Sequence, residues 1–284
     1  MMSSRQIRWS AAAPPEPPQR LREHSVRRRW LAAGAALIIA LAGTIAGVLL
    51  NRGPGVLLTT SFPRATRLVT NERAYASPHG VGIRTSKTWE VTSGSLFSRD
   101  GAGWTGIPDG VAPDATSSNA TDSAVFRVIT RRAGFADVTV RFDLKVMRLV
   151  TTPRTPSTSY DGVHVFLRYL SQRHLYVVSV FRRDGMVAIK EKLPGGPANG
   201  GSYHTLAESR HRIPVGRWMP VSVTIVTLAS QKVRISLDID SRPVLAVTQP
   251  RSGIPAILRS GHVGLRGDNC EFYFRDFTVA AASP

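Results

Sequence analysis

Four polar side chains of this sequence have types and a spacing that could do chemistry, namely those of His164, Arg168, Tyr176 and Arg182. A tyrosine or histidine can remove a proton from carbon, and a nearby arginine can neutralise an adjoining carboxylate. His164, Arg168 and Tyr176 could therefore cleave a uronic acid polymer by β-elimination. The four side chains could instead bind an anionic ligand without changing it.

Two predicted strands, 163–170 and 175–182, must hold these side chains. Residues of one strand point alternately to the two faces of a sheet, and residues of neighbouring antiparallel strands lie opposite one another. A regular ladder would place Arg168 opposite Tyr176. All four polar side chains would then share one face of one sheet, a grouping that a one-residue bulge would break.

Alternation of apolar and polar residues continues through most of the chain beyond residue 85, most cleanly at 138–146 and 233–239. Further strands are predicted at 124–130, 163–170, 175–182, 186–193, 221–228, 244–248, 262–266 and 271–279. The pair Asp184-Gly185 predicts a two-residue type I′ hairpin, since both positions of that turn need positive φ. These patterns predict an all-β fold, an antiparallel two-sheet jelly-roll sandwich.

An uncharged apolar run at 31–50 is long enough to cross a ~30 Å hydrocarbon core as a helix. Arginines are frequent in the segment before it, so the positive-inside rule predicts that the N-terminus lies in the cytoplasm. We therefore expect a disordered cytoplasmic tail at 1–29, a transmembrane signal-anchor helix at 30–51, a linker at 52–61 and an extracytoplasmic domain at 62–281. A cleaved signal peptide is the alternative, although its apolar region would usually be shorter, about 7–15 residues.

The formal net charge of the chain is +18 at pH 7, which favours anionic partners through an attraction that salt weakens. Outside the cytoplasm we expect no nucleic acid, and an anionic polysaccharide or cell-wall polymer is the expected partner.

Cys270 is the only cysteine, which excludes an internal disulfide and a multi-cysteine metal site. The histidines lack the spacing of a zinc protease. The sequence leaves the oligomeric state open.

A family resemblance rests on the order of several segments. They are W-E-V-T-S-G-S-L (89–96), D-G-V-H-V-F-L-R-Y (161–169), L-Y-V-V-S-V-F-R-R-D-G-M-V-A-I-K (175–190), G-R-W-M-P-V-S-V (216–223), S-G-H-V-G-L-R-G-D-N (260–269) and E-F-Y-F-R-D-F-T-V (271–279). Over residues 62–280 the chain resembles the concanavalin A-like lectin/glucanase superfamily, in particular actinobacterial membrane-anchored extracytoplasmic domains of the laminin-G or family-16 glucanase-like type. The resemblance implies a jelly roll whose concave sheet holds carbohydrate. The superfamily includes glycosidases, polysaccharide lyases, lectins and adhesion modules, so no single activity is implied.

Two sites of that superfamily can be looked for in this chain. Family-16 glucanases resemble one another in an E-x-D-x-E strand, whereas here only Asp238 and Asp240 have the alternate spacing and the outer glutamates are absent. The resemblance also implies a structural calcium ion that ties the first and last strands, with Glu72 and Asp276 at the matching positions. Arg275 occupies one place of the family's usual Asp-Asp pair.

Carbohydrate binding without catalysis is the function that we favour from the sequence, because it needs only a concave surface with aromatic and hydrogen-bonding side chains. The expected ligand-binding residues are Trp104, His164, Arg168, Tyr176 and Arg182, with Trp104 presented by the loop 101–110. Two alternatives remain, an enzyme that acts on an anionic polysaccharide (the lyase, or a glycoside hydrolase) and a structural module that docks on a protein.

Overall fold

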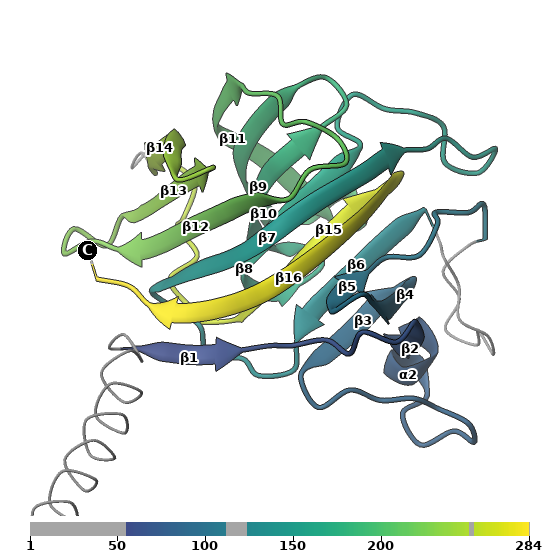
Figure 1. The fold of residues 1–284 in the computed structure, drawn as a ribbon. Coiled ribbons are helices and arrows are strands. Elements are labelled where there is room, and N and C mark those ends of the chain that lie inside the picture. The colour runs from purple at the N-terminus through teal and green to yellow at the C-terminus, as the bar shows by residue number, and fades with distance from the viewer. Residues whose placement is uncertain (1–54, 112–123, 250–252, 284) are drawn as a thin grey trace, which may run out of the picture. The chain divides into compact units, whose positions relative to one another are not determined.

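The structure is a computed structural model that describes residues 55–111, 124–249 and 253–283 (Figure 1). The expected tail at 1–29 and transmembrane segment at 30–51 lie outside these residues. In the described ranges, no helix has both the length and the apolar character needed to cross a membrane.

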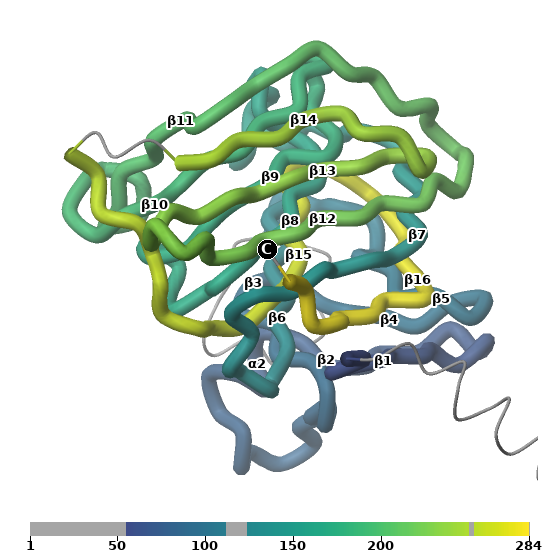
Figure 2. The backbone as a smooth tube through the Cα atoms, turned by 90° about the vertical axis from the view of Figure 1, so that its left-hand side faces the viewer, coloured from purple at the N-terminus to yellow at the C-terminus, as the bar shows by residue number. Residues whose placement is uncertain are grey.

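Two antiparallel sheets stack on one another in the described part of the chain, as the two views in Figure 1 and Figure 2 show. The predicted all-β two-sheet sandwich is therefore confirmed. One sheet has nine strands in the order β14-β13-β12-β7-β16-β5-β4-β2, with β1 paired to β16. The other has seven strands in the order β11-β10-β9-β8-β15-β6-β3. The last two strands of the chain, β15 and β16, are thus interior strands of the two sheets.

The strands of the nine-stranded sheet are β1 (Val56–Thr59), β2 (Arg67–Asn71), β4 (Ser95–Arg99), β5 (Ala102–Trp104), β7 (Val138–Leu149), β12 (Met219–Thr227), β13 (Val233–Ile239), β14 (Arg242–Thr248) and β16 (Cys270–Ala281). Those of the seven-stranded sheet are β3 (Trp89–Ser93), β6 (Val125–Thr130), β8 (Gly162–Ser171), β9 (His174–Arg182), β10 (Met186–Ala198), β11 (Gly201–Arg210) and β15 (His262–Asp268). One short helix, α2 (Glu72–Ala76), follows β2.

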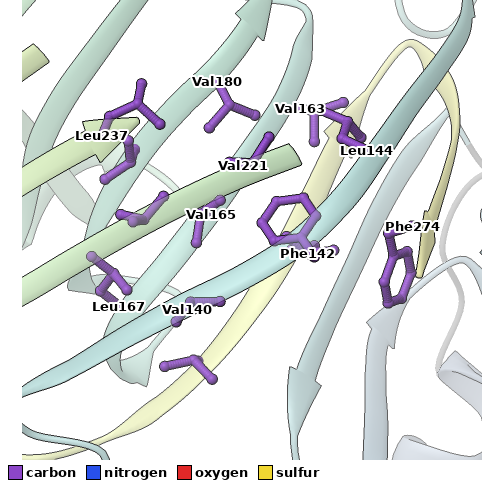
Figure 3. Packing of buried hydrophobic residues seen from close by; sticks show 14 of the residues in the cluster. Val140, Phe142, Leu144, Val163, Val165, Leu167, Val180, Val221, Leu237 and Phe274 are labelled. Atoms are coloured by element: carbon purple, nitrogen blue, oxygen red, sulfur yellow. The ribbon is translucent and has the colours of Figure 1, made fainter. Parts of the chain in front are cut away.

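The core lies between the two sheets and is built from alternate residues of their strands. Figure 3 shows Phe142 and Leu144 of β7 facing Val163 and Val165 of β8, and all four are buried. Each fully buried side chain of this kind stabilises the fold by roughly 1.5–3 kcal/mol relative to an exposed one. The residues between them in sequence point to the outer faces, and on β8 one such residue is His164.

All ten predicted strands are present, and 233–239 matches β13 at both ends. The alternation does not predict β1 to β5 or β11. The strand β1 lies within the expected linker 52–61 and pairs with β16, so the folded sheet begins earlier than expected. Short strands such as β5 contain too few residues for a period of two to be visible in the sequence.

The hairpin at Asp184-Gly185 is present, but its expected turn type is wrong. Three residues, Arg183 to Gly185, connect β9 to β10, and of these only Gly185 has positive φ, at 75°. The carboxylate of Asp184 accepts a hydrogen bond from the backbone N–H of Met186 at 3.0 Å, which favours the longer loop. Positive φ at both residues of a two-residue loop occurs instead at Asp240-Ser241, which joins β13 to β14, and also at Asp100-Gly101 and Asn199-Gly200.

Candidate functional site

A cavity of about 470 Å³ lies on the outer face of the seven-stranded sheet. We call it the outer-face cavity. Its floor includes His164 and Ser179, which alternate along their strands with inward-facing core valines. Tyr160 and Tyr203 also line it and are 52% and 39% exposed. A cavity of this volume with aromatic walls and a few polar groups has the usual character of a small-ligand site.

The register of three strands, β8, β9 and β15, brings the floor residues together. Ser179 of β9 lies opposite His164 of β8, and His164 lies opposite Arg266 of β15 on its other side. Asp268 lies two residues beyond Arg266 and therefore points to the same face. The His164 Nδ1 atom is 2.9 Å from Ser179 Oγ, and its Nε2 atom is 3.3 Å from an Asp268 carboxylate oxygen.

Arg266 holds Asp268 through two hydrogen bonds of 2.7 Å, one to each carboxylate oxygen. Burial alone would raise the pKa of Asp268, but Arg266 and His164 outweigh it and hold that pKa well below its usual range. Burial also lowers the pKa of His164, more than the neighbouring Asp268 raises it. Near neutral pH the cavity floor therefore contains an ionised aspartate and an uncharged imidazole.

Cations gather at this cavity beyond what Asp268 can neutralise. Arg127 of β6 lies directly opposite Arg266, and like charges at such positions repel each other. Lys190 and Lys192 of β10 line the cavity as well. Burial, together with Arg266 and Arg127, lowers the pKa of Lys192 to about 8. Burial also lowers the pKa of Lys190. Asp268 stabilises the charge of Arg266 and raises its pKa, whereas burial and the charge of Arg266 lower the pKa values of Lys192 and Arg127.

The expected face shared by His164, Arg168, Tyr176 and Arg182 does not form. Tyr176 lies opposite Leu167 instead of Arg168, because the ladder between β8 and β9 shifts between Val163 and His164 and again after Leu167. Each one-residue shift moves the following side chains to the other face. Of the four residues, only His164 lines the outer-face cavity.

Arg168 is buried inside the domain. Its backbone has a φ of 44°, a left-handed conformation that is uncommon for an arginine in a strand. Its guanidinium donates hydrogen bonds to the backbone oxygens of Ala136 (3.1 Å) and Ile257 (2.6 Å), to the Asp137 carboxylate (2.9 Å) and to the Thr227 hydroxyl (2.6 Å). All of these acceptors belong to the domain itself, so Arg168 has a structural role.

Tyr176 is fully buried in the core, against our expectation. Its hydroxyl donates to the Gln249 side-chain oxygen at 2.6 Å and accepts from the Ile257 backbone N–H at 3.0 Å. Gln249 in turn donates to Glu191, another buried residue. Arg182 lies at the end of β9 and pairs with Asp184. With Arg168 and Tyr176 both turned away from His164, the three-residue lyase arrangement is not assembled.

Trp104 belongs to β5 of the other sheet, not to a loop, and is only 9% exposed. Its indole N–H donates to Glu271 at 3.0 Å, and its ring stacks on Tyr273. Trp89 packs in the core against Phe62, Phe274 and Phe277. Trp104 therefore cannot contact a ligand that is bound at His164.

The two acidic arrangements that the family resemblance suggested are also not assembled. Asp240 has a φ of 55° and lies in the turn after β13, whereas Asp238 lies in the strand. Glu72 follows β2, and its carboxylate accepts the Gly94 backbone N–H at 2.7 Å. Asp276 lies on β16, and two strands, β5 and β4, lie between β16 and β2. Strands β2 and β16 are therefore roughly 14 Å apart, and no single calcium ion could bind both Glu72 and Asp276. No cluster of three or more His, Cys, Asp or Glu side chains suits a metal ion in the described ranges.

Sequence reasoning missed most of the cavity residues. They are Tyr160, Ser179, Lys190, Lys192, Tyr203, Arg266 and Asp268. A signal for some of them was present, because R-G-D at 266–268 interrupts an otherwise apolar strand with two charges at alternate positions. Their grouping depends on pairing between strands that are far apart in sequence.

Comparisons with known proteins found similarity only to solved structures. No family model matches the chain, and no curated protein matches it in sequence. The carbohydrate-binding module CBM66 from Bacillus subtilis is a similar solved structure, with 13% identity and a TM-score of 0.45 over 68% of this chain and 95% of that one. Lectin II from Ulex europaeus has 10% identity and a TM-score of 0.43 over 80% of this chain and 100% of that one.

Proposed function

We propose that the outer-face cavity binds an anionic carbohydrate, such as a segment of an acidic polysaccharide or cell-wall polymer. One observation carries the proposal, namely that Lys190, Lys192 and Arg266 all line the cavity, whereas Asp268 is the one acidic residue among its described lining residues. Mutually repelling cations in a cavity are stabilised when an anion binds between them. A carboxylate or sulfate on the ligand would supply that charge.

The aromatic walls favour a sugar over a simple anion. Tyr160 and Tyr203 present partly exposed rings, whose faces can cover the apolar side of a sugar ring. The floor and the lysines supply the polar groups that would bind sugar hydroxyls. A bare inorganic anion would leave the tyrosine faces unused. The combination therefore fits an acidic sugar unit within a chain.

The test is the affinity of the full-length protein for polygalacturonate, measured by calorimetry, with neutral dextran as the comparison ligand. The double substitution Lys190→Gln and Lys192→Gln should weaken polygalacturonate binding at least tenfold, a loss of about 1.4 kcal/mol. Binding should also weaken as the pH rises through about 8, because Lys192 then loses the charge that attracts the ligand.

Lys232→Gln, which removes a lysine in the turn between β12 and β13, is the matched control and should leave the affinity unchanged. Added salt should weaken wild-type binding, since the attraction is electrostatic. Equal affinity for dextran, or an unchanged affinity in the double variant, would show that the cavity is not a site for acidic sugars.

We also propose that residues 30–51 anchor the protein in the membrane and place the domain outside the cytoplasm. The uncharged run at 31–50 and the arginines before it support this orientation. Protease added to intact cells should then digest the domain, while a tag fused to residue 1 stays protected. A domain that resists digestion until the membrane is opened would reverse the proposed orientation.

A further inference from the structure

The hydrogen-bonded chain on the cavity floor contains the groups of a nucleophilic catalytic site. Ser179, His164 and Asp268 follow one another at 2.9 Å and 3.3 Å, and all three line the same cavity. They come from β9, β8 and β15, and the strand register sets their order. A serine, a base and a carboxylate in that order are the parts that activate a hydroxyl for attack on a carbonyl group.

The charges around the imidazole decide which of its nitrogens carries the proton. Asp268 is ionised and can only accept a hydrogen bond, so the proton of the neutral ring lies on Nε2. The Nδ1 atom then has a free electron pair, and the Ser179 hydroxyl donates to it. His164 is therefore held as a base toward Ser179, and Arg266 fixes the position of Asp268.

We propose that Ser179 is a nucleophile that cleaves an ester, with His164 as its base and Asp268 as the positioning residue. The substrate class is an ester-linked acyl group carried by the carbohydrate that binds in the cavity, and this part of the inference rests on the proposed function. An ester is the fitting class because its carbonyl carbon accepts a hydroxyl nucleophile and its cleavage needs no co-reactant other than water.

Ser179 Oγ forms a bond to the carbonyl carbon while its proton passes to His164 Nδ1. The bond from that carbon to the sugar oxygen then breaks, and the sugar oxygen takes the proton from Nδ1. A water molecule next attacks the acyl group on Ser179, again giving its proton to Nδ1. Release of the carboxylic acid returns the proton to Ser179 Oγ.

Lys190 can stabilise the negative charge that develops on the carbonyl oxygen. It lies two residues along β10 from Ala188, the residue directly opposite Ser179, so its side chain is on the same face and diagonal to the serine. Diagonal neighbours on adjacent strands are within reach of long side chains. A cation aimed at the developing oxyanion is the kind of interaction that lowers the barrier of acyl transfer.

The test uses a fluorophosphonate probe, which reacts with activated serines and releases fluoride. Full-length protein treated with the probe should carry the added mass on the peptide that contains Ser179. Ser179→Ala should lose both this label and the hydrolysis of p-nitrophenyl acetate, with the rate of hydrolysis falling at least about 100-fold. His164→Asn should have the same effect, since asparagine can hydrogen-bond to Ser179 but cannot take its proton. Ser236→Ala, a strand serine of the other sheet, is the matched control and should keep both.

Two further readings separate this proposal from the binding function and from a purely structural role. The melting temperature of Ser179→Ala shows whether it is folded, and polygalacturonate binding is measured on the wild-type protein. Wild-type hydrolysis should stay constant through neutral pH and fall only below the ordinary histidine pKa of about 6.5, where the imidazole gains a proton. An unlabelled Ser179, or hydrolysis that persists in folded Ser179→Ala, would overturn the nucleophile. Labelling without polygalacturonate binding would overturn the proposed ligand alone.

Discussion

Replacing Arg168 with methionine is expected to lower the free energy of unfolding by about 3 kcal/mol or more, because it removes a buried donor of several hydrogen bonds and each acceptor left unsatisfied inside the domain costs about 1–3 kcal/mol. Arg168 is only 1% exposed. Its guanidinium donates hydrogen bonds to four acceptors, which lie on three different segments of the chain. Methionine fills a similar volume but donates nothing, so those acceptors lose their partner inside the domain. The left-handed backbone at this position would remain, without the bonds that offset its cost.

Urea unfolding followed by fluorescence measures this loss directly, through the shift in the midpoint. Arg234→Met is the matched control, since Arg234 lies exposed in β13 and surface substitutions usually change stability by less than about 0.5 kcal/mol. If both variants unfold at the wild-type midpoint, Arg168 is not the structural link between segments that we describe.

Gly264→Ala is expected to destabilise the domain by about 3 kcal/mol or more, through a clash between the added Cβ atom and the backbone of the neighbouring strand. A Cβ atom at Gly264 would lie 2.1 Å from the carbonyl oxygen of Val128, so β15 and β6 would have to move apart. Overpacking of this kind typically costs about 1–3 kcal/mol when side chains can adjust, and here the obstacle is a main-chain atom. Because β15 carries Arg266 and Asp268, the variant should also bind polygalacturonate more weakly.

Thermal unfolding with calorimetry is the measurement for the Gly264 variant. Gly110→Ala is its control, because a Cβ there meets nothing nearer than 3.7 Å, from the Thr152 side chain, and the position does not need a positive φ. That variant should keep the wild-type melting temperature or exceed it slightly. Equal melting temperatures for both variants would mean that β6 and β15 tolerate a wider separation than the structure shows.

The fold could be predicted from the sequence further than the site could. Strict alternation, as in 138–146 and 233–239, specifies a strand with one buried face, and such runs were located within a few residues of their ends. The cavity depends on which strands pair and in which register. The local sequence around Arg168 gives no sign of its left-handed backbone, yet that conformation accompanies the register shift that turns Arg168 inward.

His164 was identified and most of its neighbours were not, and the difference has a physical cause. A histidine within an apolar strand is visible in the sequence itself. Its partners Ser179 and Asp268 are 15 and 104 positions away and look like the ordinary polar residues of strands. Only pairing of β8 with both β9 and β15 makes them a group. The net charge of the sequence indicated an anionic partner, but it did not indicate which strands carry the cations that line the cavity.

The interior positions of β15 and β16 determine when this domain can fold. Until residues 262–281 are available, β8 has no link to β6 and β7 has none to β5, so each sheet exists as two separate halves. A chain still growing on the ribosome therefore cannot complete either sheet. Closure must await the synthesis of residues 262–281 and then join segments that are far apart in sequence, which makes folding slow.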